Sequence, residues 1–276
     1  MGYFKNSDTN GMEFYHGSKT GIKGQIAPNK SAGAADFGEG FYLGTREMQT
    51  LSRVSNEPNP FEYKFNIPDT CINKNNTIYL GRDEWMFFVL YNRRRLEDMQ
   101  GTEFYEHYKH LADGKDFVIG PIADDVYDMC VKDFCDGQIT DWTYQQLIDC
   151  FDYGIQVVAK SQRACDCLEK TCERAITKEE RKELINSRKL TRKQRVAYYL
   201  EKRAEFNAEH RGEFLSEIKD TIRIRETAEV SIMKAQQQII VSQDEIKKCQ
   251  MEINDFQNIN FPSKIHAKES AEYGLF

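Results

Sequence analysis

A break in composition after Ser161 constrains the fold of this chain more than any other feature. Residues 162–258 contain one glycine and no proline, and they are rich in Glu, Lys, Arg, Gln and Ala. These five residue types favour helix, and the two types that interrupt helices are almost missing. We therefore predict domains at 1–175 and 176–258, followed by a tail at 259–276. The region after Ser161 is expected to be wholly helical.

Two stretches of this region have the pattern of a capping box, in which a Thr and a Glu or Gln three residues later cap a helix start. They are Thr177 to Glu180 and Thr191 to Gln194. We accordingly predict helix starts at both positions, with a break before Thr191.

A seven-residue repeat of large residues begins at Ile218. Its members are Ile218, Arg225, Ile232, Ile239, Ile246 and Ile253, and the residues three positions later are mostly small. This pattern predicts a long helix that packs closely on another helix. The cover could be residues 177–210 folded back as a hairpin, or a partner chain. Because 177–210 has only a patchy apolar stripe, we favour an intermolecular, coiled-coil-like contact.

The first 160 residues mix short apolar runs with helical patterns, which indicates an α+β fold. Strands are expected at 13–18, 41–43, 61–67, 77–80, 116–122 and 153–159, the last being the final core strand. Helices are expected at 46–54, 83–96, from Asp124 and Asp125 to about Phe134, and from Thr140 or Thr143 onward. For the first helix, Thr45 is the predicted N-cap, with Met48, Leu51 and Val54 on its inner face.

The stretch from Asp36 to Thr45 is rich in glycine and ends in good strand formers. It predicts a tight loop that leads into a short strand beside an open pocket. Phe41 and Tyr42 should face opposite sides of that strand, because side chains alternate along a strand.

The overall composition fits a folded protein, with 40% hydrophobic and 30% charged residues and a net charge of −6. This charge gives no global attraction to nucleic acid or to an anionic membrane. We find no cleavable leader pattern and no apolar run of about 20 residues, so we expect a cytoplasmic protein. The cysteines at 165, 167 and 172 fit no common zinc spacing, so we expect reduced thiols and no metal site.

Four motifs occur in a fixed order: Tyr-His-Gly-Ser at 15–18, Asp-Phe-Gly-Glu-Gly-Phe-Tyr-Leu-Gly at 36–44, Gly-Pro-Ile-Ala-Asp at 120–124 and Tyr-Gly-Ile-Gln-Val at 153–157. Together they resemble the ADP-ribosyltransferase superfamily, in its diphtheria-toxin and poly(ADP-ribose) polymerase branch. More closely, they resemble an uncharacterised bacterial family of this superfamily that is often found near toxin–antitoxin genes. The resemblance covers roughly the first 170 residues.

This resemblance implies a split β-sheet core of two small sheets and NAD as the substrate. It assigns His16 to a ribose hydroxyl, the Gly17 backbone to the nicotinamide amide and the Tyr42 ring to stacking on nicotinamide. It further implies that Ser18, Phe37, Gly38 and Gly40 line the same site. As a partner it implies a macromolecular acceptor, protein or nucleic acid. The C-terminal helices lie outside the resemblance, and their seam predicts an antitoxin or a second copy as partner.

The third catalytic position departs from the better-known members, because Gln156 stands where many have Glu. Gln forms hydrogen bonds but cannot act as a charged base, so we expect single transfer rather than polymer synthesis. Asp36, Glu39 and Asp124 are candidates for a helping carboxylate, although Asp124 and Asp125 could equally cap a helix. The sequence therefore predicts a mono-ADP-ribosyltransferase of toxin or effector type. The alternative is a catalytically silent module that binds NAD or ADP-ribose and assembles through its helical tail.

A cluster of basic residues lies in the helical region, at Arg188, Lys189, Arg192, Lys193 and Arg195. It could contact phosphates. Since acidic residues surround it and no aromatic residues are interleaved, we interpret it as a solvated helix face.

Overall fold

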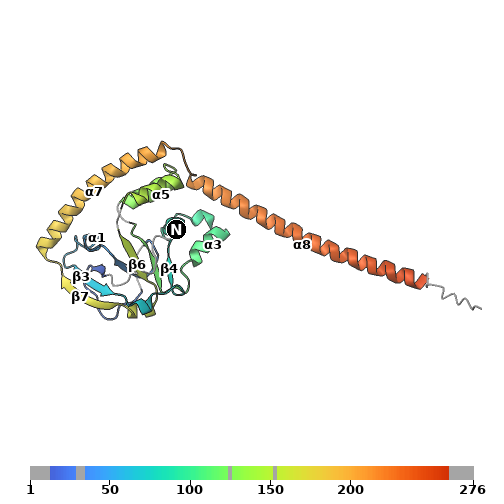
Figure 1. Cartoon of the computed structure of the whole chain (residues 1–276), viewed down its shortest axis with the longest axis horizontal. Helices are drawn as coiled ribbons and strands as arrows, with labels where there is room; N and C mark the ends of the chain where they lie inside the picture. Colours follow the sequence, from blue (N-terminus) through green and yellow to red (C-terminus); the bar gives the residue numbers. More distant parts are fainter. Residues whose placement is uncertain (1–12, 29–34, 124–125, 152–153, 261–276) are drawn as a thin grey trace, which may run out of the picture. The chain divides into compact units, whose positions relative to one another are not determined.

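The computed structural model describes residues 13–28, 35–123, 126–151 and 154–260 (Figure 1). Within these residues a mixed sheet of seven strands has the order β4-β5-β6-β2-β1-β3-β7. The strands are β1 (Phe14–Ser18), β2 (Phe41–Gly44), β3 (Phe61–Asn66), β4 (Thr77–Tyr79), β5 (Phe117–Pro121), β6 (Ile155–Ala159) and β7 (Glu169–Ala175). The expected mixture of helices and strands is thus confirmed, in one continuous sheet where we expected two.

Strand pairing follows the local sequence patterns. β3 alternates aromatic and polar residues, as predicted for a strand that presents one face to a core. β6 is buried along its whole length, because it lies between β5 and β2 and both faces of the sheet are covered there. The β4–β5 pair is parallel, and the other neighbouring strands are antiparallel.

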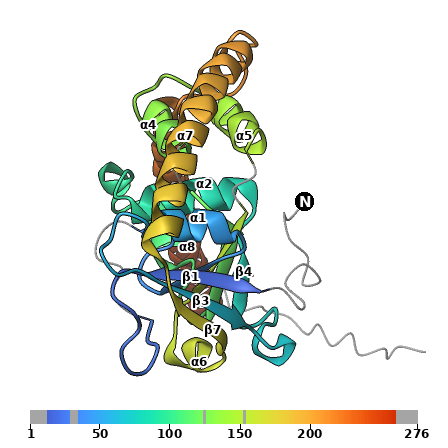
Figure 2. The ribbon, with the colours of Figure 1, turned by 90° about the vertical axis from the view of Figure 1, so that its left-hand side faces the viewer.

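Helices cover the sheet on both faces. They are α1 (Glu47–Ser52), α2 (Arg82–Asn92), α3 (Glu103–His110), α4 (Val126–Cys135), α5 (Asp141–Asp149), α6 (Gln162–Asp166), α7 (Lys178–Asn207) and α8 (Leu215–Asn260), with short 3-10 turns at Asp69–Cys71 and Glu97–Met99. In Figure 2, α7 runs beside α1, α4 and α5, while α6 lies at the other end of the sheet near β7.

Each face of the sheet has its own hydrophobic core. One core contains Trp85, Tyr127 and Tyr144 from α2, α4 and α5, which are almost fully buried. The other contains Phe14 and Phe65 together with residues of α6. Burying one such side chain contributes roughly 1.5–3 kcal/mol, so these aromatic residues account for much of the attachment of the helices to the sheet.

Two predicted helix starts are confirmed by their caps. The Thr140 side chain accepts a hydrogen bond from the Thr143 amide at the start of α5. Thr177 and Glu180 form the complete capping box of α7. The second predicted box is wrong, because Thr191 lies inside the continuous helix α7. The Thr and Gln of this pattern stand in the middle of a helix whose preceding turn is already formed, so they do not cap a helix start.

Three details of the predicted helices are also corrected. The N-cap of α1 is Arg46 rather than Thr45, and Met48 is 57% exposed rather than on the inner face. The helix α2 ends at Asn92, short of Leu96, and Arg94 adopts a left-handed conformation with φ of 57°. The predicted start of α4 at Asp124 and Asp125 lies outside the described residues, as does Tyr153.

The predicted all-helical region after Ser161 is wrong at two places, because β7 forms at Glu169–Ala175 and residues 208–214 connect α7 to α8 without a helix. β7 pairs with β3 along its length and is mostly exposed. Its residues have no apolar alternation, so the backbone hydrogen bonds to β3 hold this strand rather than any hydrophobic pattern. The strand at 155–159 is therefore not the last strand of the sheet.

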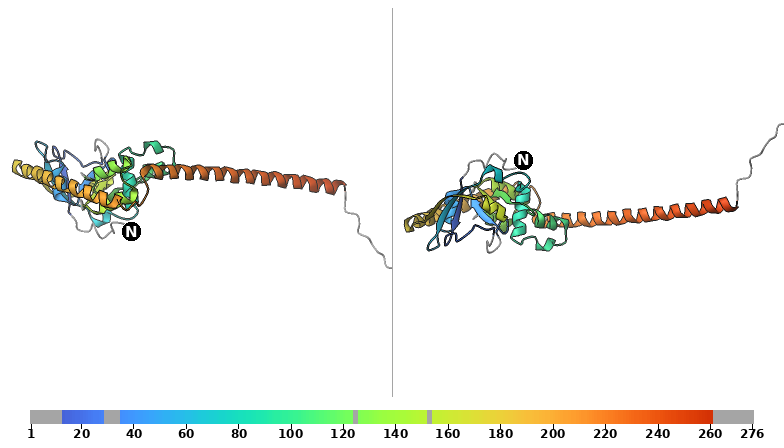
Figure 3. Two further views of the ribbon diagram at one scale, coloured as in Figure 1. Left: turned by 90° about the horizontal axis from the view of Figure 1, so that it is seen from above. Right: turned by 90° about the horizontal axis from the view of Figure 1, so that it is seen from below.

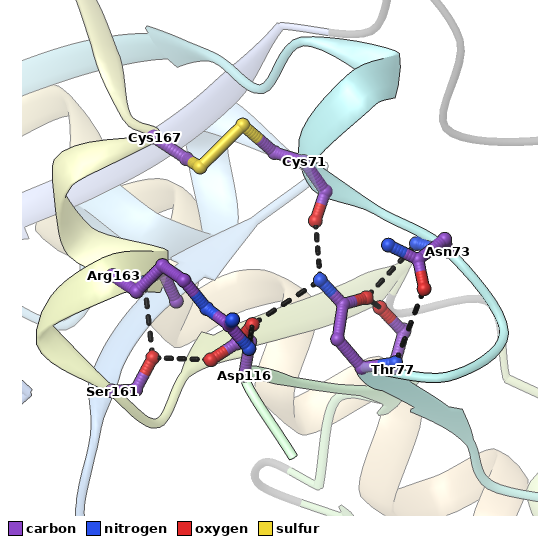
Figure 4. Close-up of a disulfide and its surroundings, with 9 residues drawn as sticks. Cys71, Asn73, Thr77, Asp116, Ser161, Arg163 and Cys167 are labelled. Atoms are coloured by element: carbon purple, nitrogen blue, oxygen red, sulfur yellow. Dashed lines mark hydrogen bonds and ion pairs between the residues drawn. A yellow bond between two sulfur atoms is a disulfide. The ribbon is translucent and has the colours of Figure 1, made fainter.

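A disulfide joins Cys71 to Cys167, whose Cα atoms lie 6.2 Å apart (Figure 4). It connects the turn after β3 to the end of α6, 96 residues further on. The expectation that all the cysteines are reduced thiols is wrong for this pair. Close by, Asp116 accepts hydrogen bonds from Asn76 and Ser161, and these bonds fix the start of β5.

The chain forms two compact units, of which the first ends at Ile222 and the second begins at Arg223. The first turns of α8 belong to the first unit, where Leu215 and Ile222 are buried. Figure 3 shows residues 223–260 as uninterrupted helix. Among the described helices, none combines the length and the apolar character needed to cross a bilayer.

Candidate functional site

The sheet order places the three motif strands side by side as β1, β2 and β6. These strands carry His16, Tyr42 and Gln156. Gly44 of β2 is the link between them, because it pairs with Tyr15 on one side and with Gln156 on the other. Three segments that are far apart in sequence thus meet at the centre of the sheet.

β1 and β2 separate directly after this point. β1 pairs with β3 at five positions but with β2 only at Tyr15. Beyond Tyr15 the contact between the two strands is made by a side chain, since His16 Nδ1 lies 2.8 Å from the carbonyl oxygen of Tyr42. The β2-facing edge of residues 16–18 is therefore outside the ladder, and Gly17 and the half-buried Ser18 lie on it.

The bond to Tyr42 fixes the tautomer of His16. A carbonyl oxygen only accepts, so the proton sits on Nδ1 and Nε2 keeps its lone pair. Burial lowers the pKa of His16 below its ordinary value, and the bond to the Tyr42 carbonyl opposes this only in part. His16 is therefore neutral at physiological pH. Its ring stacks on Phe41 at 4.3 Å between centroids.

Phe41 and Tyr42 face opposite sides of β2, as predicted. Phe41 packs against the core that contains Phe14, whereas Tyr42 packs against the core that contains Trp85. The His16 ring lies with Phe41. His16 therefore contacts the backbone of Tyr42, and the two rings do not contact each other.

The Tyr42 hydroxyl holds the glycine-rich loop that precedes β2. It donates to the carbonyl of Gly38 at 2.6 Å and accepts from the amide of Phe37 at 3.0 Å. Burial raises the pKa of Tyr42, so the hydroxyl keeps its proton. The Phe37 side chain is fully buried and packs near Phe88, so its ring lies in the core rather than on an open surface.

Lys160 fixes the same loop from the end of β6. Its ammonium group donates to the carbonyl of Phe37 at 2.7 Å and to the carbonyl of Glu39. Burial lowers the pKa of Lys160 to about 8. Gly40 lets the loop lie close to β6, because a Cβ at this position would lie 2.3 Å from the Val158 side chain. The sequence offered no sign of this role, since Lys160 simply follows a strand.

Gln156 lies in a buried polar network with Asp36 and Arg93. Its amide nitrogen is 3.3 Å from Asp36 Oδ2 and 3.0 Å from the carbonyl oxygen of Pro121. Both partners accept, so the amide nitrogen must face them. Arg93 donates to Asp36 Oδ1 through two nitrogens, at 2.6 and 3.1 Å, and to Asp128 at 2.6 Å.

Charge pairing stabilises this network. Burial alone would lower the pKa of Arg93, but Asp36 and Asp128 outweigh it and raise the pKa. Asp36 is therefore a paired carboxylate next to Gln156 rather than a base open to solvent. Sequence reasoning missed Arg93, which reaches this position because α2 ends at Asn92 and the chain turns at Arg94.

The candidate carboxylates differ in their surroundings. Asp36 is buried, Glu39 is exposed, and Asp124 lies outside the described residues. A further acid, Glu62, pairs in register with Gly17 and is fully buried beside Arg174. Burial and a hydrogen bond with Glu47 raise the pKa of Glu62, against the opposing charge of Arg174.

Helix α1 closes over the part of the sheet that contains Gly17. A Cβ at Gly17 would lie 2.9 Å from the Thr50 carbonyl oxygen, so this position accepts only glycine. Among the described residues, no cluster of three or more His, Cys, Asp or Glu side chains is placed to hold a metal ion.

The basic cluster of α7 lies apart from these strands. Lys189, Arg192 and Lys193 line a groove of about 940 Å³ along α7, together with apolar residues that include Leu190 and Leu200. Arg188 instead donates to the carbonyl of Ser52, which ties α7 to the end of α1.

Comparison with known families places the chain in a defined group. A family model described as "Protein of unknown function (DUF3990)" matches residues 12–170, which is more than half of the chain. The chain therefore belongs to this family. No curated protein and no solved structure matches it.

Proposed function

We propose that this protein is an NAD-dependent mono-ADP-ribosyltransferase of toxin or effector type, active in the cytoplasm. It would transfer ADP-ribose from NAD to a macromolecular acceptor and release nicotinamide. One observation carries the proposal: β1, β2 and β6, the strands that carry His16, Tyr42 and Gln156, are neighbours, and β1 leaves β2 directly after Tyr15.

The separation of β1 from β2 fits a ligand that binds backbone. The Gly17 edge that faces β2 lies outside the ladder, so its polar groups can bond the carboxamide of nicotinamide. His16 Nε2 is an acceptor suited to a ribose hydroxyl, because Nδ1 is already bonded to Tyr42. The Tyr42 ring would stack on nicotinamide from the opposite side of β2, at the end of the glycine loop.

Breaking the nicotinamide–ribose bond develops positive charge on the ribose. A site that promotes this step has to hold both halves of the substrate and stabilise that charge better than it stabilises the ground state. In this chain the Gln156 amide can position the ribose. The carboxylate of Asp36, which bonds the Gln156 amide, supplies negative charge next to it, and the positive charge of Arg93 offsets part of that charge. Since Gln156 cannot take a proton from an acceptor, either the acceptor brings a nucleophile that needs no base or another carboxylate removes the proton.

A second function is favoured by the same network. The Gln156 amide donates to Asp36 and to the Pro121 carbonyl, and Asp36 is in turn paired with Arg93. An amide held in this way can fix a ligand without turning it over. The alternative is thus a silent module that binds NAD or ADP-ribose.

The test is incubation of the purified full chain with labelled NAD and cell lysate, with nicotinamide release followed in parallel. Calorimetry measures NAD binding. His16→Ala should weaken binding and abolish label transfer, whereas His107→Ala, an exposed histidine of α3, should change neither.

Each outcome assigns one function. Transfer that is lost in His16→Ala supports the transferase, and binding without release of nicotinamide supports the silent module. If neither NAD nor ADP-ribose binds, both proposals are wrong.

A further inference from the structure

Part of α8 presents a regular apolar seam to solvent. Ile232, Ile239, Ile246 and Ile253 are each more than half exposed, and they recur every seven residues. Three of the four residues three positions after them, Ala235, Ser242 and Cys249, are small, and the fourth is Phe256. A helix with such a stripe is stable in water only when another surface covers the stripe.

The N-terminal end of the seam is set by the two repeat positions that precede Ile232. Ile218, the first member of the sequence repeat, packs against the core of the first unit, so it is not available for a partner. Arg225 occupies the next equivalent position and interrupts the apolar repeat. The seam therefore extends from Ile232 to Phe256, on the order of 36 Å at 1.5 Å per residue.

Helix α7 is a poor cover for this seam. Its buried residues Leu184 and Tyr199 pack on the first unit, where the Tyr199 hydroxyl bonds Asp133. Its outer face is broken by charge, since Lys193 lies between Leu190 and Leu200 along the same stripe. A hairpin within the chain would thus oppose a lysine to the isoleucine seam.

The residues that flank the seam suit an identical copy. On one side the flank is uncharged, with Gln236, Gln243 and Gln250 spaced by seven residues, and on the other side it contains Gln238 and Glu245. In a parallel pair of helices, each residue of the second flank meets the residue five positions later in the partner. Gln238 then faces Gln243 of the second copy, and Glu245 faces an amide at Gln250.

Other arrangements use these flanks less well. An antiparallel copy would place the flank that carries Glu245 and Glu252 against the same acidic flank. An acidic partner would meet amides on the first flank and the like charges of Glu245 and Glu252 on the second, and a basic partner could form ion pairs with the second flank alone. The flanks therefore favour a parallel arrangement of identical chains, in which no like charges meet.

We propose that the seam from Ile232 to Phe256 of α8 pairs in parallel and in register with the same seam of a second copy of this chain. The small residues Ala235 and Ser242 let the two helices approach closely. Such an interface is two-fold symmetric and closes at two chains. It does not depend on the proposed enzymatic function.

Cys249 provides a direct measurement of the register. In a parallel, in-register pair it lies opposite its twin, within the Cα separation of roughly 4.4–6.8 Å that a disulfide requires. Mild oxidation of the full chain should therefore give a disulfide-linked dimer on a non-reducing gel. Cys249→Ser should remove this dimer.

Shifted cysteines test the same geometry without native Cys249. In the Cys249→Ser background, Ser242→Cys lies on the seam and should restore the cross-link. In that background, Gln237→Cys lies on the outer side of the helix and should not. Cross-linking at Gln237→Cys but not at Ser242→Cys would overturn the proposed register.

The mass in solution tests the association itself. Light scattering should give twice the chain mass of 32.2 kDa. Ile239→Asp should halve this mass, whereas Ile240→Asp, the exposed neighbour beside the seam, should leave it unchanged. A wild-type chain that stays monomeric at high concentration would overturn the proposal, as would equal effects of the two substitutions.

Discussion

The side-chain amide of Gln156 and the carboxylate of Asp36 lie 3.3 Å apart, although 120 residues separate them in sequence. Asp36 begins the glycine-rich loop, and Gln156 lies near the start of the interior strand β6. The bond between them therefore attaches the loop to the sheet. It also explains why an amide suits position 156, since a carboxylate there would face a second carboxylate and a carbonyl oxygen.

We predict that Gln156→Glu destabilises the protein by about 3 kcal/mol at pH 7, because it buries two like charges side by side. The new carboxyl should have a raised pKa in the folded state. Its unfolded pKa is about 4.3, so the loss should be small near pH 4 and should grow as the pH rises to neutrality. Denaturant unfolding at several pH values measures this effect.

The matched control is Gln145→Glu, which replaces a half-buried glutamine whose bond to an aspartate, Asp83, lies at the surface. Solvent screens this pair, so the cost should stay below about 1 kcal/mol. Equal losses for the two variants would show that the buried network does not hold Gln156.

We predict that Tyr42→Phe loosens the glycine loop but keeps the stacking surface. Removal of the hydroxyl breaks its bonds to Gly38 and Phe37, which should lower the free energy of unfolding by about 1–2 kcal/mol. Affinity for NAD should fall further in Tyr42→Ala, where loss of ring stacking costs on the order of 1–3 kcal/mol. Calorimetry and denaturant unfolding separate the two effects, and Tyr198→Phe, an exposed tyrosine of α7, serves as control.

We predict a pH-dependent contribution from Lys160. Its folded pKa of about 8 is below the unfolded value of about 10.4, so the unfolded chain binds one more proton between these pH values. Stability from this group must then rise with pH across that window. The difference in unfolding free energy between wild type and Lys160→Met should show this rise.

Lys115→Met is the control for this experiment, because the Lys115 ammonium also donates to a backbone carbonyl, that of Asn75, at the surface. If the Lys160→Met difference is flat from pH 8 to pH 10, the burial of Lys160 has no titratable effect.

We predict that the Cys71–Cys167 disulfide leaves six of the eight cysteines free to react. Maleimide labelling in denaturant should add six groups before reduction and eight after it, as intact mass shows. Closing a loop of 96 residues should stabilise the chain by about 4–5 kcal/mol in the chain-entropy description. Cys71→Ser should lower the unfolding midpoint accordingly, whereas Cys172→Ser should change it little, and eight groups without reductant would contradict the bond.

Local sequence determined those parts of the fold whose cause is local. The alternation of residues 61–67 predicted β3, Thr177 predicted the start of α7, and Thr140 was one of the two predicted starts of α5. The opposite orientations of Phe41 and Tyr42 followed from strand geometry alone. In each case neighbouring residues suffice, because hydrogen bonds within a turn and the pleat of a strand act over a few positions.

The tertiary structure alone decided the rest. β7 has no apolar pattern and forms because β3 offers it a free edge. Arg93 and Asp36 form an ion pair across 57 residues, and neither their composition nor their spacing pointed to it. Thr191 has the residues of a cap but lies within α7, since a helix continues wherever its backbone bonds and packing favour it. These outcomes depend on which surfaces meet after folding, and that information is spread along the whole chain.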